Sequence, residues 1–389
     1  MGLPKVSSRV RVACTRGTPL SPLLFLFVAD ALSSMLNRGQ EEGLLRGIPM
    51  PGLPNPITHI QFTDDTLIFL EASEANIANL HISLRCFEAV SGLRINMYKS
   101  RLLGTNIPSP TLQAYADSMG CKVASFPTHF LGLPLCVGRP LNFMWDKIIN
   151  KFHRFLASWK CRYLSLGGRL TLIKAALSSL PLFFMSLFRC PAQVLKTMDK
   201  IRRDFLWFSK DNQRKFHPLE WSEVCKVFRG GGASIKNLKS MNLALLGKWV
   251  WLFASEREAQ WVKIVRGKYG VAPGDLWPKA LSSYKASHIW KGILRIQNHV
   301  IQHSCLELGN GSTICFWEDS WLGELPLKIQ FPLLYRLSPE RDICIINCYS
   351  LMAGRIVWDI RCFRNLDDSE ALEFQTLMES LLKASPNVA

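Results

Sequence analysis

One short stretch constrains the fold most strongly, because it predicts a hairpin with two acidic residues at its tip. Apolar and β-branched residues fill Ile57–Gln61 and Thr66–Leu70, which favours two strands. Phe62–Asp65 lies between them, and its Asp64 and Asp65 suit a tight connection. Two adjacent carboxylates are costly to bury unless a cation or solvent compensates them. Two interpretations remain open from these residues alone: a solvated turn and a site for a divalent metal ion.

The basic residues of the chain are concentrated in one region. Its 389 residues include 47 Lys and Arg against 30 Asp and Glu, which gives a net charge of +17. Between residues 140 and 270 there are 24 basic and 8 acidic residues, and no acid lies between Asp146 and Asp199. A localised excess of this size favours a polyanionic partner. A solubilising helical surface is the alternative interpretation.

The remaining composition predicts a globular intracellular protein. A hydrophobic content of 48% over this length supports two or three domains. The 12 cysteines are scattered without a CxxC pair, which fits reduced thiols in the nucleus or cytoplasm rather than a secreted protein. The apolar runs Leu20–Leu32 and Ala175–Phe188 are too short and interrupted to span a membrane, so no membrane partner is expected.

Helix signals flank the predicted hairpin. Gly17 and Pro19 form a turn, and Ser21 is a candidate N-cap for a helix through Asn37. A second helix is expected from Ser73 to Gly92. Helices alternating with a hairpin predict an α+β layer.

Four blocks in order resemble the reverse transcriptase of plant LINE-type, non-LTR retroelements. They are Gly17–Pro22, Phe62–Asp65, Ser91–Ser100 and Phe130–Leu135. The resemblance continues to about residue 325. It implies a partial polymerase palm, an antiparallel sheet with helices on one face, followed by a mainly helical basic thumb and a small mixed C-terminal region.

The resemblance also implies roles for individual residues. Asp64 and Asp65 match the metal-binding hairpin, where two Mg²⁺ or Mn²⁺ ions serve nucleotidyl transfer to a primer 3′-hydroxyl. Lys99 matches the lysine that contacts the triphosphate or protonates pyrophosphate, and an exposed loop lysine is its alternative interpretation. The residues implied to contact nucleotide or template are Gly17, Pro19, Ser21 and Asn96, and those of the primer grip are Leu131, Gly132 and Leu133.

This sequence departs from the family pattern in its first residues. The family's other metal-binding aspartate lies upstream of the Gly-Pro block, whereas residues 1–15 contain no Asp or Glu. Thr63 stands where the family usually has alanine, and we expect it to suit a strand. The expected enzyme is therefore an incomplete RNA-directed DNA polymerase.

Two amphipathic helices are expected in the basic region. The apolar stripes run from Trp145 to Trp159 and from Val194 to Phe208. Stripes of this kind are normally core, and the resemblance implies that the polar faces of these helices contact the backbone of a template–primer duplex. The basic residues assigned to this contact are Lys147, Lys151, Arg154, Lys196, Lys200, Arg202 and Arg203.

Three further patterns favour ordinary structure. Gly230–Gly232 lacks the ending of a phosphate-binding loop and is expected to be a flexible turn. His299, His303, Cys305 and Cys315 do not have the spacing of paired zinc ligands. Asn310-Gly311 predicts a hairpin turn between Cys305–Leu308 and Thr313–Trp317.

These expectations give four regions and two classes of function. The regions are 1–140 (truncated palm), 141–215 (helical thumb), 216–325 (downstream retroelement region) and 326–389 (tail). The first function is a retrotransposon-derived reverse transcriptase whose partners are an RNA template, a DNA primer and deoxynucleotides. The alternative is a non-catalytic nucleic-acid-binding protein or an inactive retroelement relic.

Overall fold

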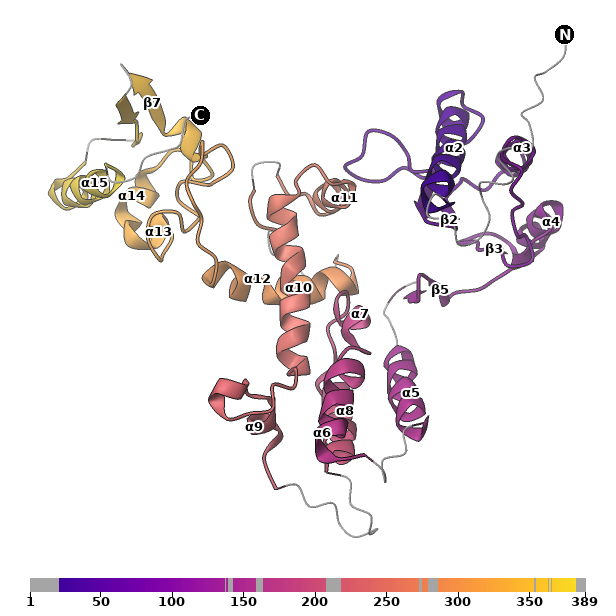
Figure 1. The fold of residues 1–389 in the computed structure, drawn as a ribbon. Helices are drawn as coiled ribbons and strands as arrows, with labels where there is room; N and C mark the ends of the chain where they lie inside the picture. Colours follow the sequence, from indigo (N-terminus) through magenta and orange to yellow (C-terminus); the bar gives the residue numbers. More distant parts are fainter. Residues whose placement is uncertain are drawn as a thin grey trace. The chain divides into compact units, whose positions relative to one another are not determined.

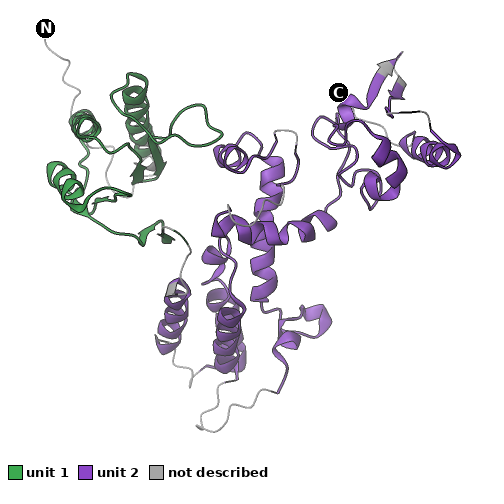
Figure 2. Ribbon diagram, turned by 180° about the vertical axis from the view of Figure 1, so that it is seen from behind, with its two compact units in different colours: residues 1–139 green, residues 140–389 purple. Residues whose placement is uncertain are grey.

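The computed structural model contains two compact units, residues 1–139 and 140–389 (Figure 2). It describes residues 21–136, 138, 143–158, 164–207, 218–272, 275–278, 286–352, 355–362, 364 and 366–382. The division between the units lies after residue 139. Helices and short strands occur together, which confirms the α+β class (Figure 1). No helix in the described ranges is long and apolar enough to cross a membrane.

Unit 1 has a small core between the helices α2 (Ser21–Glu41) and α3 (Glu74–Ser91). The core combines Leu32 and Leu36 of α2 with Leu80 and Phe87 of α3, and α4 (Ser109–Met119) adds Met119. Because α2 continues to Glu41, it is one turn longer than the helix expected through Asn37.

The ends of α3 are those expected from the sequence. Ser73 accepts a hydrogen bond on Oγ from the backbone N–H of Asn76 at 3.2 Å, which caps the first turn. Gly92 ends the helix with φ of 71°, a left-handed conformation that glycine adopts without steric cost. The predicted boundaries of this helix are therefore confirmed.

Short strands connect the helices of unit 1. Each sheet formed by residues of the described ranges has two strands, so these residues form separate strand pairs and not the larger antiparallel sheet expected for a palm. The pairs β1–β2 and β5–β6 are antiparallel, and β3–β4 is parallel. The strands are β1 (His59–Phe62), β2 (Asp65–Ile68), β3 (Arg101–Leu102), β4 (Lys122–Val123), β5 (Thr128–Phe130) and β6 (Leu133–Leu135).

Unit 2 begins with helices that pack through apolar stripes. Ile148 and Phe152 of α5 and Met198 and Phe205 of α8 are buried, and the two helices contact each other. A one-turn π-helix, η2 (Ile173–Leu177), interrupts the segment after α6 and packs on α8. The helices of this part are α5 (Phe143–Ser158), α6 (Leu166–Leu172), α7 (Leu182–Met185), α8 (Ala192–Leu206) and α9 (Trp221–Cys225).

The glycine run after α9 is a tight, fixed turn. Gly231 adopts φ of 78° after the 3-10 turn η3 (Phe228–Gly230). A Cβ on Gly232 would lie 2.2 Å from the backbone oxygen of Lys226, which is too close for any side chain. The expected flexible turn is therefore better described as a close approach of two backbone segments.

A second core lies between two long helices of unit 2, α10 (Leu238–Ser255) and α12 (His288–Gln302). Phe253 and Trp290 pack with ring centroids 5.7 Å apart, and α11 (Gln260–Tyr269) covers them. His299 lies on α12 and His303 is its C-cap residue, with ring centroids 4.4 Å apart. No group of three His, Cys, Asp or Glu side chains suited to a metal ion occurs among the described residues.

The last core of unit 2 is aromatic and surrounds Trp317. Phe316, Trp321 and Trp358 pack in it, and Trp317 donates its indole N–H to Ser338 Oγ at 3.0 Å. The surrounding elements are α13 (Leu327–Gln330), α14 (Pro332–Leu337), η4 (Ile345–Asn347), β7 (Tyr349–Met352), β8 (Arg355–Trp358) and α15 (Asp368–Leu381).

The hairpin expected around Asn310-Gly311 is absent from this core. Residues 305–308 and 313–317 form no ladder with each other, and Cys315 instead pairs with Cys344 in an isolated antiparallel bridge. Asn310 Oδ1 accepts from the N–H of Ser312 at 3.1 Å, which makes a local side-chain turn. The prediction was wrong because Asn310-Gly311 favours a turn but does not determine which segments pair as strands on either side of it.

Candidate active-site hairpin and nucleic-acid interface

The hairpin β1–β2 places two aspartates at its tip. Phe62 pairs with Asp65, so the two connecting residues are Thr63 and Asp64. Asp64 is therefore in the turn, whereas Asp65 begins β2. Both carboxylates are exposed, and Asp64 accepts a hydrogen bond on Oδ1 from Thr63 Oγ1 at 3.0 Å.

Thr63 lies in the turn and not in a strand, which corrects the expectation for this residue. Its φ is 51°, in the left-handed region that two-residue hairpin turns require. A β-branched residue is disfavoured there, because its Cβ crowds the following carbonyl oxygen. The strand propensity of threonine is thus overridden by its position in the turn.

The two faces of the hairpin have different environments. Ile60 and Phe62 project from one face and are 48% and 57% exposed. Asp65 shares that face, since residues directly opposite in a ladder point to the same side. The opposite face carries His59 and Gln61, which contact α2 through Ser33.

Ser33 anchors the hairpin to α2, a role that the sequence did not reveal. Its hydroxyl donates to Gln61 Oε1 at 2.9 Å and lies 3.0 Å from Nε2 of His59. The other ring nitrogen of His59 is 3.0 Å from Thr58 Oγ1. Burial lowers the pKa of His59 below its ordinary value of 6.5. The sequence signal that could have indicated this contact is the alternation of His59 and Gln61 with apolar residues along β1.

The carboxylates at the turn fit part of a metal centre. Hard divalent cations such as Mg²⁺ bind through carboxylate oxygens and keep several waters, so Asp64 and Asp65 suit a single hydrated ion. Two ions held close together need more carboxylate ligands than this pair. No third His, Cys, Asp or Glu side chain joins the pair within the described ranges, so these residues do not form a complete two-ion centre.

The block that contains Lys99 forms a compact turn. Asn96 Oδ1 accepts from the backbone N–H of Lys99 at 3.1 Å, and the carbonyl oxygen of Asn96 accepts from the N–H of Ser100 at 3.0 Å. Asn96 therefore shapes the backbone that presents Lys99. The Lys99 side chain is exposed and forms no ion pair with either hairpin aspartate. Gly17 and Pro19 lie outside the described residues, and Ser21 is described only as the start of α2.

The expected primer-grip residues lie in a second hairpin. Leu131 and Gly132 connect β5 to β6, with φ of 51° and 78°. Leu133 begins β6 opposite Phe130. The hairpin presents Leu131 at its tip, 37% exposed.

Two basic stripes lie on the helices α5 and α8. Lys147, Lys151 and Arg154 have the spacing i, i+4 and i+7, which places them on one face of α5, and all three are exposed. Lys196, Lys200 and Arg203 repeat that spacing on α8. Each stripe extends about 10 Å along its helix, at 1.5 Å per residue.

Arg202 does not belong to this interface. Its side chain is fully buried, and Nη1 donates to Ser178 Oγ at 3.1 Å and to the backbone oxygen of Lys236 at 3.0 Å. Its guanidinium also lies over the ring of Trp221, 5.3 Å from the centroid. The expectation that Arg202 contacts phosphate was wrong, because the residue falls one turn after Met198 and hence on the buried face of α8.

The chain is similar to three proteins of Arabidopsis thaliana. A putative ribonuclease H protein is 33% identical over 186 residues, which cover 47% of this chain and 30% of that relative. An uncharacterized mitochondrial protein is 25% identical over 151 residues, 38% of this chain and 97% of the relative. A second uncharacterized mitochondrial protein is 43% identical over 51 residues, 13% of this chain and 42% of the relative. No family model matches the chain.

Proposed function

We propose that the chain derives from a plant retroelement reverse transcriptase and binds nucleic acid by backbone contacts of its basic helices. The observation that carries the binding function is the pair of basic stripes, in which Lys147, Lys151 and Arg154 of α5 and Lys196 and Lys200 of α8 are exposed and Arg203 is half-buried. Lysine and arginine stripes without a built pocket suit phosphate contacts, which depend on charge and not on base sequence. The similarity to a relative named as a putative ribonuclease H protein supports a nucleic acid partner.

The binding test is fluorescence anisotropy of the full chain with an RNA–DNA duplex at several salt concentrations. Replacement of Lys147, Lys151 and Arg154 by Gln is expected to weaken binding and to reduce the salt slope by about 0.9 for each phosphate that is no longer neutralised. Lys196→Gln with Lys200→Gln tests the second stripe. A matched control changes two exposed basic residues of unit 1, Arg101→Gln and Lys122→Gln. An equal weakening in the control, or salt-independent binding, contradicts the proposal.

RNA-directed DNA polymerisation is the second candidate function. The specific observation that favours it is the exposed carboxylate pair at the β1–β2 turn, followed along the chain by the β5–β6 hairpin. In this proposal Asp64 and Asp65 hold Mg²⁺ or Mn²⁺, which when bound lowers the cost of charge developing on the transferred phosphoryl group. Lys99 provides an ammonium near the triphosphate. A second ion requires a carboxylate from outside the described residues.

The polymerisation test is primer extension on an RNA template with deoxynucleotides and either metal. Loss of extension in Asp64→Ala and in Asp65→Ala, with duplex binding retained, is the expected result for a catalytic pair. Asp117→Ala on the exposed surface of α4 is the matched control. Duplex binding without primer extension under either metal would identify the chain as a non-catalytic nucleic-acid-binding protein. Failure to bind, together with rapid proteolysis, assigns it to the relics.

A further inference from the structure

Cys315 and Cys344 lie directly opposite each other in the aromatic core of unit 2. They form an isolated antiparallel bridge, flanked by two backbone hydrogen bonds. Phe316 N–H donates to the oxygen of Ile343 at 2.8 Å, and Ile345 N–H donates to the oxygen of Ile314 at 3.0 Å. This pattern makes the cysteines a non-hydrogen-bonded pair, in which opposed Cα atoms are about 4.5 Å apart and the side chains approach closely. Disulfides accommodate Cα separations of about 4.4–6.8 Å.

The surroundings hold the two thiols in this position. Both cysteines are free thiols, Cys315 buried and Cys344 half-buried. Asp319 Oδ2 accepts from the N–H of Cys315 at 2.8 Å, which fixes the first backbone segment. The 3-10 turn η4 follows Cys344 directly and fixes the second.

We propose that Cys315 and Cys344 are a redox-modification site that forms a reversible disulfide with a small-molecule disulfide as the oxidant. The thiolate of Cys344, the more accessible residue, attacks one sulfur of the oxidant, and the first small thiol leaves with the other sulfur. Cys315 then attacks the sulfur of Cys344 and displaces the second small thiol. The two cysteines lose two electrons to the oxidant, and their two protons are recovered on the released thiols.

The electrostatics of the pair agree with this order of attack. Burial raises the pKa of Cys315 to about 12, so its thiolate is scarce at neutral pH. Burial also raises the pKa of Cys344, but the positive charge of Arg257 opposes that shift. Cys344 is therefore the better nucleophile for the first step.

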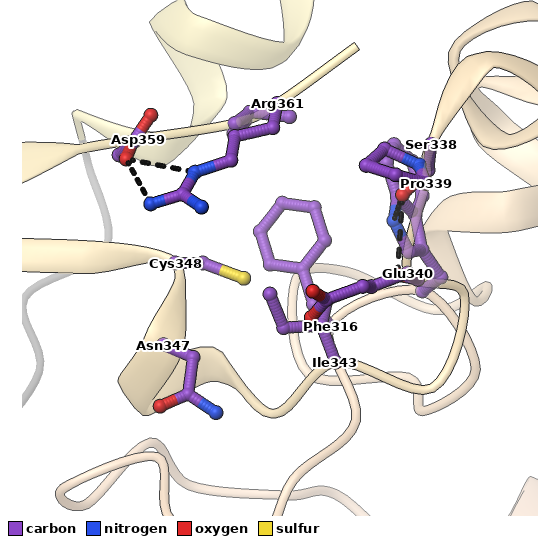
Figure 3. A pocket seen from close by; sticks show the side chains of 11 residues that line it. Phe316, Ser338, Pro339, Glu340, Ile343, Asn347, Cys348, Asp359 and Arg361 are labelled. Atoms are coloured by element: carbon purple, nitrogen blue, oxygen red, sulfur yellow. Dashed lines mark hydrogen bonds and ion pairs between the residues drawn. The ribbon is translucent and has the colours of Figure 1, made fainter. Parts of the chain in front are cut away.

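A neighbouring cysteine provides the competing outcome. Cys348 donates its thiol to the backbone oxygen of Cys344 at 3.6 Å, and its side chain faces a pocket lined by Phe316, Asn347 and Arg361 (Figure 3). Cys344 and Cys348 flank the turn η4, and a disulfide between them would leave Cys315 without its partner thiol.

The test exposes the purified full chain to oxidised glutathione, blocks the remaining thiols and maps cross-linked peptides by mass spectrometry. A Cys315–Cys344 peptide that disappears on reduction, and a rise in the midpoint of tryptophan-detected thermal unfolding, are expected. Both signals should vanish in Cys344→Ser and in Cys315→Ser and persist in Cys305→Ser, a control at an exposed cysteine. Glutathione on Cys86 and Cys305 without the cross-link overturns the proposal. A Cys344–Cys348 cross-link also overturns the proposal. The cross-link is measured first in the wild-type chain, so this result does not depend on how the variants fold.

Discussion

Arg202 donates a hydrogen bond from its guanidinium to the carboxylate of Asp199, one turn earlier on α8. The arginine is fully buried, whereas the aspartate side chain is 34% exposed, so the pair leads from the interior of unit 2 to its surface. Through Ser178 and Lys236 the same guanidinium also joins the segment after η2 to the segment before α10. Arg202, one of the charges of the basic region, thus stabilises the interior of unit 2.

Arg202→Met is expected to lower the free energy of unfolding of unit 2 by about 3 kcal/mol, because the buried partners of the guanidinium lose their donor. The matched control is Lys200→Met, an exposed position two residues earlier that should change stability by less than about 0.5 kcal/mol. Urea unfolding followed by tryptophan fluorescence measures both, because every tryptophan lies in unit 2. A small effect at Arg202 would contradict its structural role.

Thr63→Gly is expected to stabilise the β1–β2 hairpin by about 1 kcal/mol. Glycine adopts the φ of 51° without the steric cost that a β-branched residue incurs. Hydrogen exchange at the amides of β1 and β2 measures the opening free energy of the hairpin. The matched control is Thr66→Gly on β2, where the loss of strand propensity should lower the opening free energy.

Acidification is expected to weaken the contact between α2 and β1. Burial lowers the folded-state pKa of His59, so the unfolded chain binds a proton first as the pH falls below about 6.5. The stabilisation is therefore present above pH 6.5 and is lost as the pH falls towards the folded-state pKa. Hydrogen exchange of α2 and β1 between pH 5 and 7.5 measures this loss, after correction for intrinsic exchange. His59→Gln should remove the dependence, and His81→Gln should leave it unchanged.

Asp319→Asn is expected to stabilise unit 2 relative to the natural chain as the pH rises. Burial raises the folded-state pKa of Asp319, so folding favours the protonated form and stability declines as the pH rises through that pKa. Asparagine keeps an acceptor for the N–H of Cys315 without the charge. Tryptophan-detected urea unfolding between pH 4 and 7 should show a difference in the free energy of unfolding, between the variant and the natural chain, that grows with pH. Asp359→Asn, at an exposed ion pair, is the control.

Local signals predicted local structure well. Ser73 and Gly92 predicted both ends of α3, because a cap depends on the residue at the cap and on its nearest turn. Likewise, the apolar flanks predicted the β1–β2 hairpin, although the positions of Thr63 and Asp64 in its turn required the register.

The sequence pattern did not predict the contacts between segments that are far apart in the chain. Arg202 lies within a run of basic residues, and its burial depends on Ser178, Lys236 and Trp221, which come from three other segments. Cys315 and Cys344 meet across a long connection for the same reason. A charge pattern identifies a basic region, but the packing of each helix decides which of its charges reach solvent.

The close approach at Gly232 makes the glycine run informative about the history of the gene. Any missense change at this codon adds at least a Cβ, which would meet the Lys226 backbone oxygen at 2.2 Å. Two residues earlier, a Cβ on Gly230 would meet only side-chain atoms at 3.9 Å. Copies that drift without selection should lose the two glycines at equal rates. Copies in which the folded product is still selected should keep Gly232 and vary at Gly230, so a comparison of genomic copies tests whether this fold is under selection.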